Sequence, residues 1–404
     1  MVELIYIVSH VSSESATVPK SSTFTSMSAY APFQPIVRQI LDQLAVGGPI
    51  RSTGGTFPAS DYADTSHLQH EFDTLFSGFP QAVALSPDLP EPGSQITRDG
   101  LGLPVVLTRD EEGKVHALAN VCAHRGAQVV EHGRHCSKRL TCPYHGWSYQ
   151  PDGTLVGLPD AGSFPDRTTP APGMRSLPVV EEHGVIWVTP SFDAEPPSPG
   201  LGPIADDLDH FSITTHHHWR SHRFELDLNW KLVIDTFLEG YHFSTLHRNT
   251  VGPLFVANLC VADRFGPHVR EVLPRRTFAS LADQEPEQWD LVPHTALVYV
   301  LFPNTVFVMQ TDHIETWRVM PHPTDPSRST TDLDFYVPQL PETDSALRHW
   351  EANWRITIDT VIEEDFAAMA GVQRGLASGA LEQITAGQNE PALAMFHQSL
   401  VDAR

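Results

Sequence analysis

The sequence predicts an α+β protein in which a small all-β module precedes a larger domain, an antiparallel sheet flanked by helices. Between about residues 80 and 190, short strand-like runs alternate with turn sequences such as those at 110–113 and 151–153. The stretch 191–205, rich in Pro and Gly, indicates a linker. Beyond it, strand-like runs lead into one long helix with an apolar stripe, which is the pattern of an α+β domain.

The composition argues against several functional classes. Lys and Arg number 26 against 49 Asp and Glu, and the net charge of −23 argues against a surface for nucleic acid or an anionic membrane. No apolar run approaches the ~18–20 residues that span a bilayer, so we expect no membrane segment. The first residues lack the basic segment of a signal peptide, and 4 Cys do not form a disulfide framework, which favours the cytoplasm. The 22 His raise the expectation of metal chemistry.

Residues 1–30 are rich in Ser and Thr without a sustained period, and they predict a mobile tail. The sequence leaves open whether translation starts at the first residue or at Met27. Residues 31–79 predict N-terminal helices that pack on the larger domain. One is expected at 34–46, where apolar residues recur at helical spacing, and a second at 65–76.

The β module is expected to span 80–190 and the larger domain 206–404. In the module, strands are expected at 103–108, 115–121 and 185–188. In the larger domain, helices are expected at 230–246 and 345–376, and strands at 254–262, 296–302, 305–310, 313–320 and 331–338.

Two Cys–His pairs carry the strongest signal for chemistry. Cys122 and His124 form the first pair, and Cys142 and His145 form the second after an interval of 17 residues. Two thiolates and two imidazoles can hold a tetrahedral zinc, or a [2Fe–2S] cluster with Cys on one iron and His on the other. Zinc motifs usually pair like with like, so the mixed pairs favour the cluster.

The segments around these pairs, 120–126 and 142–149, resemble the cluster-binding loops of Rieske non-haem iron oxygenases. The resemblance extends over about residues 60–380, and it implies that the two Cys and two His bind a Rieske [2Fe–2S] cluster. The remaining thiols and two nearby imidazoles have no partner at ligand spacing and are expected to be ordinary residues: Cys136, Cys260, His132 and His135.

An oxygenase of this kind needs a second centre where O2 binds, and the segment 229–247 supplies candidates. Two His and one carboxylate on adjacent vertices form the facial triad that binds Fe(II) and leaves positions open for O2 and substrate. His242 and His247 are five residues apart, roughly 140° round an ideal helix. Both can reach one metal only if the helix ends or distorts between them.

The carboxylate ligand must come from elsewhere, and the helix at 345–376 offers Glu363, Glu364 and Asp365. Spacing alone does not separate these three. The resemblance does, because the ligand helix of the family carries its Asp ligand eight residues before a Gln, which matches Asp365 and Gln373. It therefore implies a mononuclear iron held by this Asp and the two His, in a catalytic domain with a helix-grip-like fold.

Glu239 stands three residues before His242, so both lie on one face of a helix. By the resemblance, this carboxylate bridges the two centres across a subunit boundary and links His145 of one chain to His242 of the next in a homotrimer. Asp235, seven residues before His242, is the rival for this role. A Glu at the bridge is similar to the choline, glycine-betaine and carnitine monooxygenase branch of the family.

Two further polar residues, Asn229 and Tyr241, lie close in sequence to the iron ligands, which suggests a role in holding them. A helix cap or a core contact explains either residue equally well. Aromatic side chains between about 250 and 320 are expected to line the substrate pocket: Phe255, Phe265, Tyr299, Phe302, Phe307 and Trp317. Such rings can cage a trialkylammonium group or stack on an aromatic substrate.

The resemblance implies the terminal oxygenase component of a Rieske system, which uses O2 and electrons from a separate NAD(P)H-dependent flavin/iron–sulfur reductase or a ferredoxin. No dinucleotide-binding Gly motif follows a strand, in agreement with a separate reductase. The expected outcome is monooxygenation, dioxygenation or demethylation of a small substrate, either a quaternary amine or an aromatic compound. Two other classes stay open: an electron-transfer Rieske ferredoxin, and a non-enzymatic zinc-stabilised ligand-binding protein.

Overall fold

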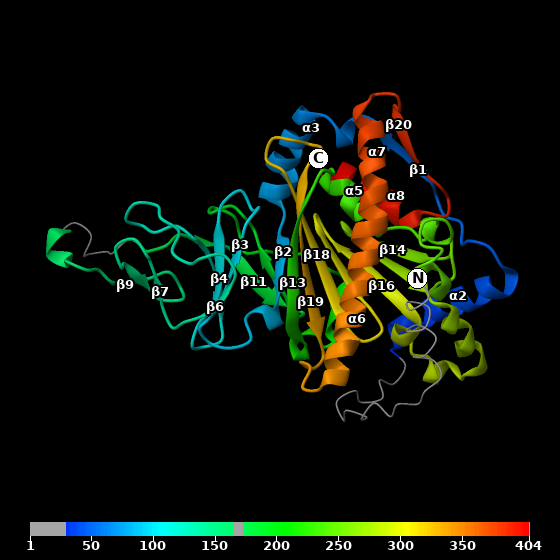
Figure 1. The fold of residues 1–404 in the computed structure, drawn as a ribbon, viewed down its shortest axis with the longest axis horizontal. Helices are drawn as coiled ribbons and strands as arrows, with labels where there is room; N and C mark the ends of the chain where they lie inside the picture. Colours follow the sequence, from blue (N-terminus) through cyan, green and yellow to red (C-terminus); the bar gives the residue numbers. More distant parts are fainter. Residues whose placement is uncertain (1–29, 165–172, 404) are drawn as a thin grey trace.

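The computed structural model describes residues 30–164 and 173–403. The tail expected at 1–30 therefore lies, apart from its last residue, outside the described residues. Figure 1 shows a smaller part built from β-strands beside a larger part in which a broad sheet is crossed by a long helix. The described chain starts in the larger part, passes through the smaller part and returns.

The smaller part contains three antiparallel sheets, with the strand orders β10-β5-β4-β3-β6, β11-β12-β2 and β7-β8-β9. Its strands are β2 (Gln81–Leu85), β3 (Ser94–Arg98), β4 (Val105–Arg109), β5 (Val115–Ala119), β6 (Arg134–Cys136), β7 (Leu140–Thr141), β8 (Ser148–Tyr149), β9 (Leu155–Gly157), β10 (Ser176–Leu177), β11 (Val179–Glu182) and β12 (Val185–Val188). The predicted all-β module is confirmed.

The larger part is built on one seven-stranded antiparallel sheet with the order β13-β19-β18-β17-β16-β15-β14. Its strands are β13 (His217–Leu226), β14 (Val261–Phe265), β15 (His268–Pro274), β16 (Thr295–Leu301), β17 (Thr305–Met309), β18 (Ile314–Pro321) and β19 (Ser329–Val337). The predicted antiparallel sheet is confirmed, although β13 and β15 were not predicted. β13 escaped detection because His and Arg dominate it and no apolar alternation is visible.

Side chains alternate between the two faces of this sheet. On β16, Val298 and Val300 face a core that includes α5, α8 and the long helix; we call this the helix face. Leu297 and Tyr299 face the opposite side, where α2 and the strands β2 and β12 of the smaller part complete a second core. The sheet therefore divides the larger part into two separate interiors.

Seven α-helices are defined among the described residues: α2 (Gln34–Val46), α3 (Thr65–Glu71), α4 (Pro203–His210), α5 (Trp230–Asp235), α6 (Asp344–Thr360), α7 (Ala367–Ala377) and α8 (Pro391–Asp402). A two-stranded ribbon pairs β1 (Gly55–Pro58) with β20 (Gln383–Ala386). α6 and α7 form one long helix that crosses the sheet (Figure 1), joined by a π-helical turn at Val361–Phe366. Trp350 of α6 packs on Phe335 of β19, which fixes this helix on the helix face.

Two expected elements of the larger domain are wrong in part. The helix expected at 230–246 ends at Asp235. It does not resume before His242, where the Glu239 carboxylate accepts the backbone N–H groups of Tyr241 and His242 that a helix would have used. The strand expected at 254–262 begins only at Val261. The helix expected at 345–376 lies where predicted, and the π-turn within it was not foreseen.

The N-terminal helices lie against both interiors. α2 buries Ile36 and Ile40 against the face opposite the helix face. α3 is tied to α5 by Glu71, which accepts from Lys231 Nζ at 2.5 Å and from Trp230 Nε1 at 2.8 Å. Burial raises the pKa of Glu71, but the Lys231 ammonium and these hydrogen bonds lower it to about 2.

A buried ionic network joins the smaller part to the sheet. Arg134 donates to Asp88 of the smaller part at 2.7 Å and to Asp334 of β19 at 2.9 Å. Arg98 reaches the same two carboxylates at 3.2 and 3.4 Å, and the Tyr336 hydroxyl of β19 also donates to Asp88. Charges buried in this way are tolerated because each has several partners.

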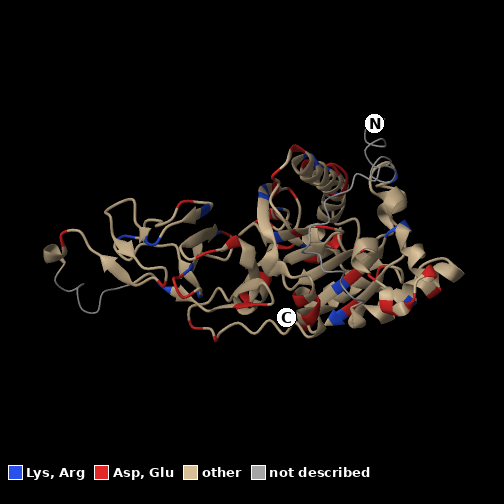
Figure 2. Ribbon diagram, turned by 90° about the horizontal axis from the view of Figure 1, so that it is seen from below, with Lys and Arg blue, Asp and Glu red and all other residues tan. Residues whose placement is uncertain are grey.

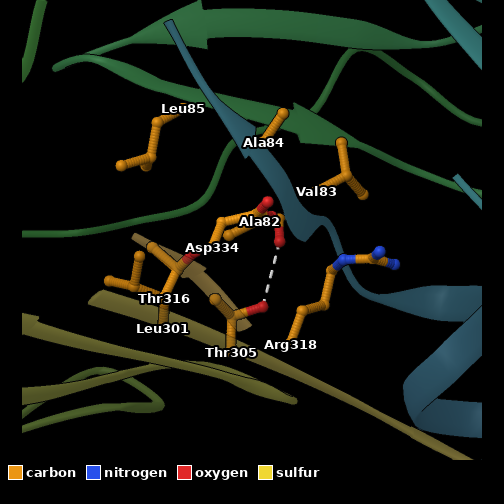
Figure 3. A pocket seen from close by; sticks show the side chains of 9 residues that line it. All are labelled: Ala82, Val83, Ala84, Leu85, Leu301, Thr305, Thr316, Arg318 and Asp334. Carbon is orange, nitrogen blue, oxygen red and sulfur yellow. Dashed lines mark hydrogen bonds between the residues drawn. The ribbon is translucent and has the colours of Figure 1, made fainter. Parts of the chain in front are cut away.

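The two parts pack closely beside this network. Figure 3 shows β2 lying over the sheet, with the Thr305 hydroxyl donating to the Ala82 carbonyl at 2.9 Å. The gap between them measures about 10 Å³, room for one water molecule at most. Arg318 and Asp334 border this gap, so the ionic network and the apolar contact form one continuous interface.

Acidic residues are spread over both parts of the molecule, with Lys and Arg interspersed among them (Figure 2). Over the described residues this distribution offers no basic stripe of the kind that follows a nucleic-acid backbone. Within the same residues, no helix is both long and apolar enough to cross a membrane.

We predict that Asp334→Asn lowers the free energy of unfolding by about 3–5 kcal/mol, because it leaves the buried Arg98 and the half-buried Arg134 short of one carboxylate. Although burial raises the pKa of Asp334, Arg98, His218 and Arg134 hold it well below its usual value. The contribution of the Asp334 carboxylate to stability is therefore fully present above its pKa in the unfolded chain, about 4, and is lost as the pH falls through its pKa in the folded protein. Urea denaturation at pH 7 and at acidic pH measures both effects.

The matched control is Glu111→Gln, which removes an exposed ion pair with Lys138 at 3.5 Å. Exposed pairs of this type contribute about 0–1 kcal/mol, so the unfolding midpoint should barely move. Equal stabilities for Asp334→Asn and the wild type would show that the network does not hold the two parts together.

Two candidate metal centres and a cavity

The two Cys–His loops have the same backbone construction. Cys122 N–H donates to the Ala127 carbonyl at 2.8 Å, and the Cys122 carbonyl accepts from Gly126 at 3.0 Å. Around Cys142 the same pair of bonds recurs at 2.8 and 3.0 Å, with Gly146 in the place of the first Gly. Gly126 has a φ of 79° and Gly146 one of 74°, a conformation that favours Gly, so both turns depend on that residue.

These loops bring the four predicted side chains into one region at the tip of the smaller part. Cys122 and Cys142 are buried, whereas His145 is exposed and His124 is half-buried. The two imidazoles face each other with 3.1 Å between their Nδ1 atoms. The His124 ring also stacks on Trp147 at 4.8 Å, which fixes its plane.

The spacing of these four groups bears on the choice between zinc and a cluster. Ligand atoms around one tetrahedral zinc lie about 3–4 Å apart, since Zn–S and Zn–N bonds measure about 2.3 and 2.0 Å. Among the described residues, only one set of three or more possible ligand atoms lies within 4.8 Å of one another, and it is in the larger part. No three ligand atoms of the Cys–His set come that close to one another. The Cys–His set is therefore too wide for a single ion, and two buried thiols with two outward imidazoles fit a [2Fe–2S] cluster.

The set of ligand atoms that do lie within 4.8 Å of one another, called the compact set below, belongs to His242, His247 and Asp365. The two Nε2 atoms are 3.0 Å apart, and Asp365 Oδ1 lies 3.0 Å from His247 Nε2 and 3.5 Å from His242 Nε2. His247 and Asp365 are buried, and His242 is half-buried. Two imidazoles and one carboxylate converge here as in a facial triad.

A carboxylate holds the outer nitrogen of each imidazole. Glu239 contacts His242 Nδ1, and Glu364 Oε2 lies 2.6 Å from His247 Nδ1. If each Nδ1 carries the proton that its carboxylate accepts, both Nε2 atoms of the neutral rings present lone pairs. Three acceptors then face one another in a mostly buried site, an arrangement that a cation stabilises. The residues present therefore fit a metal ion.

The local backbone explains how residues five apart in sequence can meet. α5 has ended before His242, which lies in a 3₁₀ turn, and the chain reverses after His247. Gly252 N–H donates to the His247 carbonyl at 2.9 Å. A Cβ at Gly252 would lie 2.6 Å from that oxygen and 2.4 Å from the Phe243 carbonyl, so only Gly fits this close approach.

The π-turn separates the three acids that spacing alone left open. It directs Asp365 to the two Nε2 atoms, places Glu364 behind His247 and leaves Glu363 exposed. The Thr250 hydroxyl also donates to Glu364 at 2.6 Å. The supporting role of Glu364 was not predicted; its position beside Asp365 was visible in the sequence, but the π-turn that separates the two was not. π-turns of this kind are frequent at functional sites.

Of the two proposed bridging carboxylates, only Glu239 contacts His242. Asp235 instead accepts from Tyr62 at 2.7 Å and lies 2.9 Å from His397 Nε2, within the interior of the larger part. Glu239 lies beside Tyr241, a residue that is 58 % exposed. The Glu239–His242 contact is thus close to the surface of the chain.

Of the two explanations given for Asn229, the structure shows the helix cap. Its side chain caps α5 by accepting from Lys231 N–H and donates to the Tyr62 and Pro326 carbonyls. Tyr241 points largely into solvent. The residues expected to be ordinary lie outside both centres: Cys136 and His135 are exposed on or beside β6, His132 pairs with Asp99, and Cys260 is buried among apolar side chains.

A cavity of about 340 Å³ opens beside His242, His247 and Asp365. Most of its lining is apolar and includes Phe237, Phe243, Val251, Leu254, Phe255, Leu273, Ala296, Val298, Val308 and Val361. Its remaining wall is polar and includes Arg275, Gln310, Thr311, Asp312, His313, Glu315, His349 and Asn353. The cavity therefore joins the compact centre to a charged region.

Of the aromatic residues expected to line the pocket, only Phe255 does so. Tyr299 and Phe307 pair across β16 and β17 and share the face of the sheet away from the helix. Which face of the sheet these two side chains point to could not be known without the strand register. Phe302 and Trp317 lie on the helix face but behind the lining residues, and Phe265 packs in the other core.

Comparisons with known proteins identify the two parts. Residues 79–178 match the family described as the Rieske [2Fe-2S] domain, and residues 212–403 match the ring hydroxylating alpha subunit (catalytic domain). The carnitine monooxygenase oxygenase subunit of Acinetobacter pittii is 28 % identical over 194 residues, 48 % of this chain and 52 % of the relative, so the match spans about half the relative's length. Choline monooxygenase of Spinacia oleracea is 26 % identical over 80 % of this chain and 72 % of the relative.

A solved structure of a quaternary ammonium Rieske monooxygenase in complex with L-carnitine superposes with a TM-score of 0.72. It covers 86 % of this chain and 94 % of that chain at 22 % identity. At this identity the match supports the fold.

We predict that Glu364→Gln weakens iron binding by about 10- to 100-fold, because an amide oxygen holds the His247 Nδ1 proton less strongly than a carboxylate does. The neighbouring Glu363→Gln is the matched control, since Glu363 is exposed and should leave the affinity unchanged. Anaerobic titration of metal-free protein with Fe(II) measures both. Equal affinities for the two variants would remove Glu364 from the site.

Proposed function

The chain belongs to the alpha subunits of Rieske non-haem iron oxygenases, and from this premise we propose that it is the terminal oxygenase of a three-component or two-component system. The observation that carries the proposal is the compact set of two imidazoles and one carboxylate that opens onto a cavity of about 340 Å³. Such a centre can bind O2 beside a small organic molecule. Electrons come from NAD(P)H through a separate reductase or ferredoxin.

The proposed ligands follow from the two sites. Cys122, His124, Cys142 and His145 hold the [2Fe–2S] cluster, and the mononuclear iron is held by the compact set. When bound, the cluster supplies electrons singly and the iron provides the position where O2 is activated. The protein provides ligand geometry, fixed imidazole orientations and a largely apolar cavity that limits water around the substrate.

Glu239 is proposed to connect the two centres. Its carboxylate already contacts the outer nitrogen of His242, and the exposed His145 is free to approach it from a neighbouring subunit. A homotrimer, or a multiple of one, brings these surfaces together. A carboxylate between two imidazoles accepts a hydrogen bond from each ring and holds both in place.

The substrate is proposed to be a quaternary amine or an aromatic compound, which is monooxygenated, dioxygenated or demethylated. The Phe side chains of the cavity suit either, since phenyl faces attract both cations and aromatic rings. An electron-transfer ferredoxin would not need the cavity and the compact set. The zinc-stabilised protein is disfavoured by the wide spacing of the Cys–His set. We also propose a cytoplasmic location, where thiols stay reduced.

We predict that Cys122→Ser abolishes the brown colour and the Rieske electron paramagnetic resonance signal, because it removes a thiolate that the cluster needs. Cys136→Ser is the matched control: this thiol is exposed at the end of β6 and should leave both signals intact. A bleached Cys136→Ser protein together with a normal Cys122→Ser protein would overturn the proposed ligand set.

We predict that Glu239→Gln, loaded with Fe(II) in excess to offset weaker binding at His242, slows reoxidation of the reduced cluster by at least roughly tenfold, since the amide loses the charge and one acceptor. Stopped-flow reoxidation with O2 and carnitine or another accepted substrate measures the rate, and metal analysis checks loading. Asp235→Asn is the control, because Asp235 bonds to Tyr62 and His397 rather than to His242. Wild-type rates in Glu239→Gln would rule out the bridge.

A further inference from the structure

One basic residue in the cavity has no role in the proposed metal centres. Among the described residues that line the cavity, Arg275 is the only Lys or Arg. It follows β15, where it forms a backbone bridge with Phe255, and it is half-buried. We propose that Arg275 binds a carboxylate of the substrate, so that the substrate is a small molecule with an acid group at one end and the oxidised carbon at the other.

The bonding of Arg275 leaves capacity for such a ligand. Its Nε donates to the Thr295 carbonyl at 3.2 Å and its Nη2 to Gln310 Oε1 at 2.8 Å. Both acceptors are neutral, and within the described part of the chain no carboxylate forms an ion pair with this guanidinium. A guanidinium has five N–H groups in a planar fork that matches the two oxygens of a carboxylate. Burial lowers the pKa of Arg275, and a bound anion would offset that effect.

The nearby acids are already engaged by other donors. Asp312 lies 2.9 Å from His313 Nδ1 and 2.7 Å from His349 Nε2. Glu315 lies 3.2 Å from His313 Nε2 and accepts from Trp317 Nε1 and the Thr357 hydroxyl. They influence Arg275 only at longer range, as two charges that partly compensate it. The guanidinium therefore remains the strongest donor that faces the cavity.

The aromatic rings give the direction of the substrate. The Phe243 ring lies 4.9 Å from the His242 ring, and the Phe255 ring lies 5.2 Å from that of Phe243. The Arg275 guanidinium lies 4.7 Å from the centre of the Phe255 ring. Two phenyl rings thus separate the compact metal set from the guanidinium. A substrate that lies along them places its carboxylate at Arg275 and its opposite end at the iron.

The inference rests on the proposed function and narrows its substrate class to acids. Carnitine, γ-butyrobetaine, glycine betaine and anthranilate carry the required carboxylate, whereas choline does not. Within such a molecule the phenyl rings contact the middle or the cationic end, and Arg275 contacts the acid. An adjacent residue, Arg276, is exposed and does not line the cavity, which makes it a matched control.

The test measures binding separately from turnover. The full holoprotein, oxidised and without reductase, is titrated calorimetrically with each of these four acids, with the amide of each acid and with choline. At least one acid should bind about 10- to 100-fold more tightly than its amide, as expected for a hydrogen-bonded charge pair. Arg275→Gln should abolish this preference, Arg275→Lys should keep part of it, and Arg276→Gln should leave it unchanged.

Four outcomes would overturn the inference: no acid that binds more tightly than its amide, a preference that survives in Arg275→Gln, a loss of preference in Arg276→Gln, or tight binding of choline without binding of any acid. Circular dichroism and cluster absorbance confirm that the variants are folded and loaded. O2 consumption with a surrogate reductase tests the proposed function independently. Acid-selective binding without O2 consumption would contradict the oxygenase function and leave the Arg275 site standing. Turnover of choline alone would support the oxygenase function and contradict the Arg275 site.

Discussion

The protonation of two imidazoles is the constraint on which the catalytic domain depends. Glu239 contacts Nδ1 of His242, and Glu364 contacts Nδ1 of His247. The Nε2 atoms of the two rings therefore face each other, 3.0 Å apart. Without a cation, these acceptors and Asp365 would repel one another in a mostly buried site. The rest of the domain can be understood as the framework that keeps them together: the sheet, the long helix pressed against it by Trp350 and the π-turn that separates Glu364 from Asp365.

The smaller part obeys a different constraint. Cys122 and Cys142 are buried, His124 is half-buried and His145 is exposed, so His145 is the proposed ligand that a partner can reach. The buried network of Asp88, Arg98 and Arg134 with Asp334 fixes this part against the sheet. A junction of this kind would suit the proposed electron transfer between subunits, because the position of His145 in the proposed homotrimer would then be set by the assembly and not by a flexible linker.

Local patterns were predictable from the sequence, and arrangements that depend on register were not. The Cys–His loops were recognisable because their turns and ligands lie within a few residues of each other. The supporting role of Glu364 was hidden, since a regular helix gives no reason to separate it from Asp365. The aromatic lining was mostly wrong because β16 could not be assigned a parity: Tyr299 faces away from the cavity while its neighbour Val298 lines it. The His-rich strand β13 was missed because polar residues on both faces hide its alternation.

The charge of the whole chain sharpens the substrate argument. A protein with a net charge of −23 repels a simple anion at long range, so a carboxylate must owe its affinity to short-range contact inside the cavity. A zwitterion avoids this conflict, because its cationic group cancels the long-range repulsion while its carboxylate still meets the guanidinium. The phenyl faces between Arg275 and His242 attract that cationic group and do not compete for the acid. Among acids, the electrostatics of this chain therefore favour betaine-like molecules over purely anionic ones.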